Sequence, residues 1–320
     1  MIPTHTVSVV LTSYNYARFL NEAIESVLCQ TAAPGQVVIV DDQSSDESWP
    51  LIEHWRARDR RITALRTPER LGFIGSLNLG LAAADGHFIA ILDSDDVWLP
   101  RRLESQLNVM EQPGNLAIGV CGGNCVLIDA HGRVIGDKNY PSSDAACRRA
   151  LWYRNPFCHS ATLIRRECFQ RFGVYDEQFP MAQDLDLWFR FGQTFRFLNL
   201  PEKVTKYRIS GANSSLRRQR RLVQTTIRVR LWASRHYGYP LSPGARASLG
   251  LVWCMQWLPT GLVHSLFHKV FLRYGNYLWR SSLGETLVEP AGRSEMTQAA
   301  PNTDAGLAVA GRRPETEWRL

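Results

Sequence analysis

The chain has 320 residues, of which 45% are hydrophobic and 21% charged, a globular composition that excludes disorder or a fibrous repeat as the main state. Its formal net charge of +7 first suggests a polyanionic partner such as nucleic acid, a membrane surface or a phosphorylated substrate. The charge is regional, however. The segment from Lys203 to Gly284 contains 14 basic residues and no acidic one, which leaves about −7 for the rest of the chain.

The first 110 residues alternate between short apolar runs and stretches in which apolar residues recur at helical spacing. The apolar runs span residues 7–11, 37–40, 62–65 and 88–92. Because they do not alternate with polar residues, they are typical of strands that are buried on both faces. Strands that alternate with helices predict parallel βαβ units, whose ligands bind beyond the carboxyl ends of the strands.

Polar side chains follow three of these runs and should converge on one crevice. They are Thr12, Ser13, Tyr14 and Asn15, then Asp41 and Asp42, then Asp93, Ser94, Asp95 and Asp96. Three carboxylates within four residues repel one another unless they are neutralised. A divalent cation held by one or two of them plus substrate phosphates would do so. An EF-hand is excluded because Trp98 stands where its loop needs glycine.

Helix capping is the alternative for these acidic clusters. It could explain Asp96, before a helix opening near Leu99, as well as Ser45 and Asp46, but it does not explain three carboxylates together. Asp41 and Asp42 could instead accept hydrogen bonds from a base or a ribose. No glycine-rich phosphate loop is present, so nucleotide binding would depend on carboxylates and a metal.

Beyond residue 110 the pattern changes. Two β-like segments between 116 and 138 flank a turn at 129–132, which predicts a hairpin. A helix after 143, a strand at 161–164, an aromatic helix at 185–191 and a strand ending at Arg208 follow. The seven cysteines lack disulfide or zinc spacing and are expected to be buried, reduced thiols. No signal segment precedes the first strand, which favours a cytoplasmic location.

Several blocks of the sequence, in order and spacing, resemble the family 2 glycosyltransferases over residues 7–215. The blocks are Ser13-Tyr14-Asn15, residues 25–31, residues 40–46, Asn78-Leu79-Gly80, residues 92–96 with Trp98 and Pro100, Gln183-Asp184 with Leu187-Trp188, and Tyr207-Arg208. The resemblance implies an α/β GT-A fold. This is the Rossmann-like nucleotide-diphospho-sugar transferase fold, with a mixed, mainly parallel sheet, here followed by a helical C-terminal extension.

The resemblance also implies roles for individual residues. The residues expected to bind the nucleotide sugar are Thr12, Tyr14, Asn15, Asp41, Asp42, Asp93 and Arg208. Asp93 and Asp95 would form a DxD element that binds Mg²⁺ or Mn²⁺, with Asp95 as the direct ligand. Asp184 matches the catalytic base, for which the alternative is a helix N-cap. His159, Gln183 and Trp188 would lie on the acceptor side, although a structural role for His159 is an equal alternative.

Two positions depart from the family pattern. Gln183 stands where the family often has glutamate, and Ser210 where it often has histidine. Arg208 could supply positive charge to the diphosphate in place of that histidine. The resemblance implies metal-dependent transfer of a sugar from a nucleotide-diphosphate donor to a hydroxyl of a glycan or lipid-linked acceptor, with inversion, in cell-surface polysaccharide synthesis. The alternatives are a non-catalytic nucleotide-sugar-binding scaffold and a nucleotidyltransferase with a similar sheet.

The basic C-terminal third requires a separate interpretation. Residues 217–285 are interpreted as basic amphipathic helices on an anionic membrane surface, which would place the protein peripherally on the inner face of the cell membrane. The uncharged stretch 247–268 could instead span the bilayer, and helices packed on the catalytic domain are a further alternative. No recognition motif supports nucleic acid as a partner. The expected domains are therefore 1–216 (catalytic), 217–285 (membrane-associating) and 286–320 (disordered tail).

Overall fold

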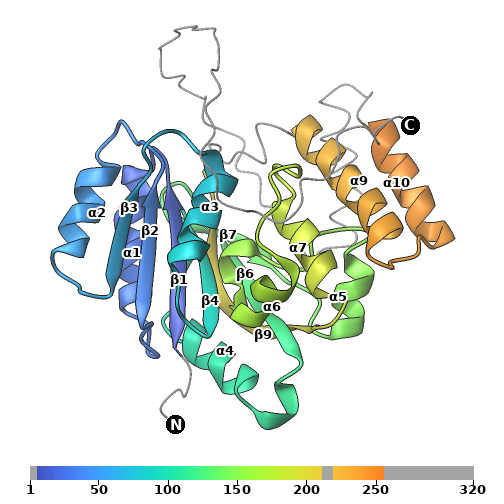
Figure 1. Ribbon diagram of the computed structural model, residues 1–320, viewed down its shortest axis with the longest axis horizontal. Helices are drawn as coiled ribbons and strands as arrows, with labels where there is room; N and C mark the ends of the chain where they lie inside the picture. Colours follow the sequence, from blue (N-terminus) through green and yellow to red (C-terminus); the bar gives the residue numbers. More distant parts are fainter. Residues whose placement is uncertain (1–5, 211–218, 256–320) are drawn as a thin grey trace, which may run out of the picture. The chain divides into compact units, whose positions relative to one another are not determined.

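The structure is a computed structural model that describes residues 6–210 and 219–255 (Figure 1). Within these residues, nine strands form one mixed sheet in the order β3-β2-β1-β4-β8-β6-β9-β5, with β7 paired to β6. The strands are β1 (Val7–Ser13), β2 (Gln36–Asp41), β3 (Ile62–Arg66), β4 (Phe88–Asp93), β5 (Val97–Trp98), β6 (Ile118–Asp129), β7 (Val134–Lys138), β8 (Leu163–Arg165) and β9 (Arg196–Ile209).

The first four of these strands form the parallel part of the sheet and confirm the predicted βαβ units. In β1 and β2 every residue except Gln36 is buried, because helices or loops cover both faces. The register places Ser13 opposite Asp41 and Thr12 opposite Asp93. The polar residues that follow β1, β2 and β4 therefore meet at one edge of the sheet, as the sequence predicted.

Helices follow these strands where the sequence pattern has helical spacing, and a fourth helix follows β5. They are α1 (Ala17–Leu28), α2 (Ser48–Arg56), α3 (Gly72–Ala83) and α4 (Arg102–Met110). Helix α3 lies against β1 and β2 at the position of Gly80. A Cβ atom on Gly80 would come within 2.6 Å of Val10 Cγ1, so only glycine permits this approach of helix to sheet.

The second half of the sheet contains antiparallel pairings. Strands β6 and β7 form the predicted hairpin, and Gly132 in its turn has a positive φ of 80°. Strand β9 pairs in parallel with β6 along most of its length and antiparallel with the short β5. The sequence predicted only the end of β9, because Pro201 and five charged residues interrupt its apolar pattern. Helices α5 (Asp144–Ala150), α6 (Arg166–Phe172) and α7 (Gln183–Phe191) complete this half.

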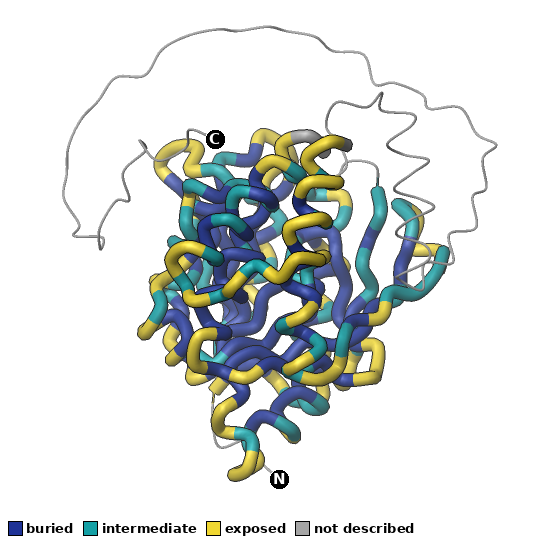
Figure 2. The backbone as a smooth tube through the Cα atoms, turned by 90° about the vertical axis from the view of Figure 1, so that its right-hand side faces the viewer, coloured by how far each residue is buried: buried dark blue, intermediate teal, exposed yellow. Residues whose placement is uncertain are grey.

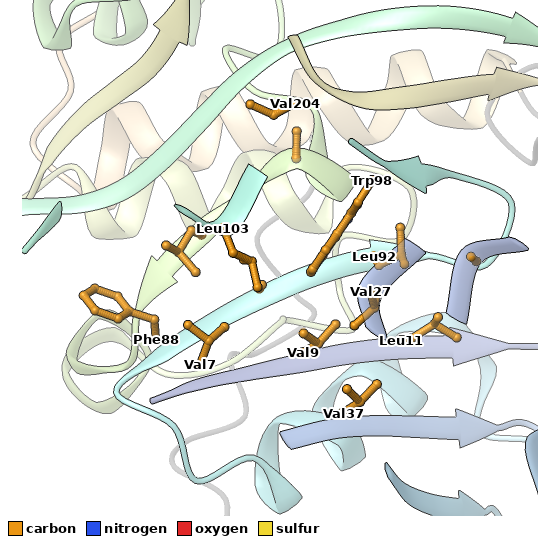
Figure 3. Packing of buried hydrophobic residues seen from close by; sticks show 14 of the residues in the cluster. Val7, Val9, Leu11, Val27, Val37, Phe88, Leu92, Trp98, Leu103 and Val204 are labelled. Carbon is orange, nitrogen blue, oxygen red and sulfur yellow. The ribbon is translucent and has the colours of Figure 1, made fainter. Parts of the chain in front are cut away.

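The main hydrophobic core lies on the face of the sheet that α1 and α4 cover. Val9, Leu11, Val37 and Leu92 point into it from the parallel strands, and Trp98 and Leu103 close it (Figure 3). Figure 2 shows the strands as a buried centre within a more exposed outer layer. Five of the seven cysteines are buried and unpaired, as predicted, while Cys29 and Cys254 are exposed.

Within the described residues, two helices follow the last strand: α9 (Gln219–His236) and α10 (Pro243–Met255). Helix α9 lies beside α7, and α10 lies beside α9 (Figure 1). Ile227, Val229, Trp232 and Ala233 of α9 are buried. Helix α9 therefore packs on the catalytic domain, which is one of the alternatives that the sequence left open for the basic region. Within residues 6–210 and 219–255, no helix is long and apolar enough to cross a membrane. The predicted amphipathic stretch beyond residue 255 and the tail 286–320 lie outside the described residues.

Candidate active site

Asp41 and Asp42 end β2 beside each other, yet their carboxylates have different surroundings. Asp42 accepts hydrogen bonds from the backbone N–H groups of Leu71 (2.7 Å) and Gly72 (2.9 Å), from Thr67 Oγ1 and from Arg70 Nε. Both of its carboxylate oxygens therefore accept hydrogen bonds from the β3–α3 loop and stabilise the position of that loop. This is inconsistent with the expected contact between Asp42 and a nucleotide.

Asp41 retains an oxygen for a ligand. Its Oδ2 accepts a hydrogen bond from Ser44 N (3.1 Å) and lies 3.3 Å from Arg66 Nε. Its Oδ1 is buried and has no hydrogen-bond partner among the described residues. Because a buried acceptor without a partner is costly, this oxygen indicates a missing donor, such as an N–H of a nucleotide base. Asp41 is thus the better candidate of the two.

The β1–α1 loop carries the other predicted nucleotide contacts. Asn15 has a φ of 54°, and its Oδ1 accepts a hydrogen bond from Ser45 N at 2.8 Å. It therefore ties its loop to the loop after β2, a structural role that sequence reasoning did not assign. The Tyr14 ring is exposed, with the Arg70 guanidinium 3.3 Å from its centroid. Thr12, by contrast, is almost completely buried at the end of β1.

The cluster after β4 is graded in exposure. The Asp93 side chain is 29% exposed, Asp95 is 8% exposed and Asp96 only 1%. Burial and the negative charge of Asp93 raise the pKa of Asp95 to about 7, and burial and Asp95 raise that of Asp96. Asp96 Oδ1 accepts a hydrogen bond from Arg208 N at 2.8 Å. The capping role considered for Asp96 is wrong, since Arg101 occupies the N-cap of α4.

This donor set fits a divalent cation that is shared with a substrate. Among residues 6–210 and 219–255 no three His, Cys, Asp or Glu side chains form a metal cluster. A site of Asp95 with Asp93 would thus supply one or two oxygen ligands and leave the others to phosphates and water, as Mg²⁺ prefers. Burial and, after it, the negative charge of Asp93 raise the pKa of Asp95, and a bound cation would oppose both effects.

Arg208 lies beneath this cluster rather than in the crevice. Its guanidinium is 2% exposed and donates to Asp95 O (2.7 Å), Asp129 O (3.2 Å) and Glu22 Oε2 (2.6 Å). A side chain so enclosed is not available to a diphosphate, which contradicts the expectation from the sequence. Instead, Arg208 holds the backbone of the acidic loop in place and helps to offset its negative charge.

Asp184 lies in the first turn of α7, two positions after the N-cap residue Ala182. The N-cap alternative is therefore wrong. Its Oδ2 accepts a hydrogen bond from Asn155 Nδ2, and its Oδ1 accepts one from Leu185 N at 2.8 Å. Burial raises the pKa of Asp184 and outweighs the opposing effects of His159, Leu185 and Asn155. A carboxylate with a raised pKa is better matched to proton transfer near neutral pH.

The two neighbours predicted on the acceptor side have different positions. Trp188 is completely buried, and its Nε1 donates to Asn155 Oδ1 at 3.1 Å. It therefore orients the partner of Asp184 and does not contact an acceptor, which corrects the prediction. Gln183 is buried, and its Oε1 has no hydrogen-bond partner among the described residues. This oxygen can still accept a hydrogen bond from a substrate hydroxyl.

His159 joins the two acidic sites. Its Nδ1 lies 3.5 Å from Asp93 Oδ1 and its Nε2 lies 2.8 Å from the Tyr175 hydroxyl. Burial alone would lower the pKa of His159, but Asp93 and Asp184 together raise it. Tyr175 is fixed in turn by Asn78, which both donates to and accepts from its backbone. Asp93 and Asp184, 91 positions apart in the sequence, therefore lie within electrostatic reach of one imidazole.

This histidine belongs to the short helix η2 (His159–Ala161). Carbonyl groups in and next to η2 accept hydrogen bonds from α4 residues that sequence reasoning did not identify. Arg102 donates to Ser160 O (2.6 Å) and Thr162 O (2.9 Å), and Gln106 Nε2 donates to Ala161 O (2.8 Å). Ser160 Oγ in turn accepts a hydrogen bond from Asp93 N at 3.0 Å. No local pattern signals a buried arginine such as Arg102, because its partners lie about 60 positions away.

Comparisons with known proteins show the family and the fold of the chain. The model of the family described as Glycosyl transferase family 2 matches residues 8–173. An uncharacterized glycosyltransferase of Haemophilus influenzae is 28% identical over 218 residues, which cover 65% of this chain and 67% of that protein. A glucosyltransferase of Escherichia coli, WfaP, which acts on alpha-D-GlcNAc-diphosphoundecaprenol with UDP-Glc, is 34% identical over 105 residues, or 33% of this chain and 41% of its own.

Among solved structures, the mannosyltransferase PcManGT of Pyrobaculum calidifontis, in complex with GDP-Man and Mn²⁺, superimposes with a TM-score of 0.54. The match covers 84% of this chain and 82% of the mannosyltransferase, with 20% sequence identity. At that identity the likeness shows a shared fold.

Proposed function

This chain belongs to glycosyl transferase family 2, and we propose that it transfers a sugar from a nucleotide-diphosphate donor to a hydroxyl of a glycan or lipid-linked acceptor. It is a glycosyltransferase with the GT-A fold that the sequence predicted. The observation that carries the finer proposal is the shared environment of Asp93 and Asp184 around His159. In this proposal, Asp93 on the donor side and Asp184 on the acceptor side belong to one site.

The donor would lie across the carboxyl ends of β1, β2 and β4. Asp41 Oδ1 would accept a hydrogen bond from the base, and the exposed ring of Tyr14 lies near the same end of the sheet. Asp95 with Asp93 would hold Mg²⁺ or Mn²⁺, which when bound stabilises the negative charge of a diphosphate leaving group. The mannosyltransferase that contains GDP-Man and Mn²⁺ supports this assignment by its fold.

Asp184 would take the proton of the acceptor hydroxyl. Asn155 and the N-terminal turn of α7 orient its carboxylate, and its raised pKa suits a general base. Attack from the side opposite the diphosphate would invert the anomeric carbon in a single displacement. The diphosphoundecaprenol acceptor in the name of the Escherichia coli relative supports a lipid-linked acceptor and a role in cell-surface polysaccharide synthesis.

The test is a donor panel with Mn²⁺, in which protection against thermal unfolding first identifies the nucleotide sugar. Transfer assays would then compare the wild type with Asp95→Ala and Asp184→Asn. We expect both variants to lose at least about 10²-fold in kcat, and Asp184→Asn to retain donor protection. A nucleoside diphosphate product supports glycosyl transfer, pyrophosphate would indicate a nucleotidyltransferase, and full activity in both variants would contradict the assigned roles.

We further propose peripheral contact with an anionic membrane. Leu251 and Trp253 of α10 are 59% and 43% exposed, and they lie in the region that carries 14 basic and no acidic residues. Apolar side chains beside basic ones are typical of an interfacial helix. We expect the chain to bind anionic liposomes at low salt and to be released at high salt.

The variant Leu251→Ser/Trp253→Ser tests whether α10 contributes to membrane binding. Leu116→Ser is the matched control, because Leu116 is equally exposed (60%) but lies after α4. We expect the α10 variant to bind liposomes at least about fivefold more weakly and the control to bind as the wild type does. Equal binding by all three proteins would contradict a contact through α10.

A further inference from the structure

The C-terminal helix α9 is connected to the helix that carries Asp184. Tyr237, the residue after α9, donates a hydrogen bond from its hydroxyl to Asp186 Oδ1 at 3.0 Å. Asp186 is completely buried in α7, two positions after Asp184. A residue of the predicted membrane extension therefore reaches the same turn of helix as the proposed catalytic base.

Asp186 is also connected, through Arg190, to the segment that precedes Tyr175. Its Oδ2 binds Arg190 Nε and Nη2, each at 2.8 Å, and the buried Arg190 donates to Phe172 O (2.5 Å) and Val174 O (2.8 Å). These carbonyl groups belong to the three residues before Tyr175, whose hydroxyl lies 2.8 Å from His159 Nε2. His159 Nδ1 in turn lies 3.5 Å from Asp93 Oδ1. One buried ion pair thus supports both acidic positions of the crevice.

A second contact from α9 is independent of the first. Arg230 is buried, and its Nε donates to Leu151 O at 2.9 Å. Leu151 begins the turn that leads to Asn155, the side chain that donates to Asp184. Trp232 packs beside Phe179, with ring centroids 6.4 Å apart, which places α9 against the segment before α7 as well.

We propose that α9 is a positioning element of the active site, in which Tyr237 and Arg230 hold Asp184 in its reactive orientation. The proposal rests on the proposed function, in which Asp184 is the base. Without the Tyr237 hydroxyl, Asp186 loses a donor within a fully buried ion pair, and the first turn of α7 gains freedom. Because a base must lie within hydrogen-bond reach of its proton, such freedom lowers the rate of the chemical step more than the binding of the donor.

The experiment compares Tyr237→Phe with Tyr239→Phe in the full chain. Both changes remove one hydroxyl from the same segment, but the Tyr239 hydroxyl accepts a hydrogen bond from Arg148 Nη1 at 3.3 Å, whereas the Tyr237 hydroxyl donates to Asp186 of α7. We expect Tyr237→Phe to lower kcat about tenfold with the donor KM within about twofold, and Tyr239→Phe to leave both within about twofold.

A second measurement does not depend on catalysis. Amide hydrogen exchange of the peptide that covers residues 183–191 should be about tenfold faster in Tyr237→Phe and unchanged in Tyr239→Phe. Unchanged exchange in Tyr237→Phe overturns the structural link, and faster exchange with an unchanged kcat overturns its role in positioning. If Asp184→Asn retains full activity while exchange in Tyr237→Phe is faster, the proposed function fails and the connection between α9 and α7 stands.

Discussion

Asp41 and Asp42 are adjacent carboxylates of one sequence block, yet their surroundings suit different tasks. The hydrogen-bond partners of Asp42 come from the segment between β3 and α3, so its carboxylate closes that loop. Asp41 Oδ1 has no partner among the described residues. Residue type alone could not separate the two, because the difference depends on where residues 67–72 return to the edge of the sheet.

We predict that Asp42→Ala lowers the free energy of unfolding by about 2 kcal/mol or more, because the buried Thr67 hydroxyl and the N–H groups of Leu71 and Gly72 lose their acceptor. Arg70→Ala, which removes only the half-exposed partner, should cost less than about 1 kcal/mol. Denaturant unfolding of both variants provides the measurement. Equal effects would mean that the ion pair, and not the backbone contacts, is the stabilising interaction.

A pH dependence follows from Asp95, whose pKa is raised to about 7 by burial and by Asp93. A carboxyl group whose pKa is higher in the folded than in the unfolded chain stabilises the fold when protonated. Without divalent cations, its contribution should therefore fall between about pH 4 and pH 7, at up to about 1.4 kcal/mol per pH unit. Asp95→Asn should flatten this part of the stability profile, and an unchanged slope would contradict the raised pKa.

At the scale of elements, the parallel half of the fold is readable from the sequence and the second half only in part. The strands β1, β2 and β4 are continuous apolar runs, and their helices show clear periodicity. Only the end of strand β9 was predicted, because charged residues occupy most of its exposed positions. The short helix η2 has no sequence signal, since its carbonyl groups are satisfied by α4 residues about 60 positions earlier.

We predict that Arg102→Met destabilises the protein by about 2–4 kcal/mol, because the buried carbonyl groups of Ser160 and Thr162 lose their donors. Arg101→Ala is the matched control, since the neighbouring Arg101 is exposed and forms a surface ion pair with Glu104. It should change the free energy of unfolding by less than about 0.5 kcal/mol. Similar losses in the two variants would contradict the role given to Arg102.

At the scale of the whole molecule, side-chain contacts cross the domain boundary that the sequence predicted at residue 216. Helix α9 buries Ile227, Val229, Trp232 and Ala233 and supplies Tyr237 to α7. The positive charge of this region led to a membrane interpretation, and its apolar face packs on the catalytic domain. Both roles are compatible, since α10 leaves Leu251 and Trp253 exposed.

We predict that a chain ending at Ser210 is less stable than the full chain by about 3 kcal/mol or more, because the surface under α9 becomes exposed to water. A chain that keeps α9 and α10 and ends at Met255 should retain the full stability of the catalytic domain. Thermal unfolding of the three proteins tests this. Equal melting temperatures for the two truncated chains would show that α9 is dispensable to the fold.

The sequence by itself determined the family, the alternation of strands and helices, and the edge of the sheet where Asp41, Asp93 and Asp95 meet. These features follow from local periodicity and from the rule that parallel strands end together. Only the tertiary structure decided which carboxylate is available, that Arg208 and Trp188 are enclosed, and that α9 supports Asp184. Those outcomes depend on contacts between residues far apart in the chain, and burial at such contacts decides what a side chain can bind.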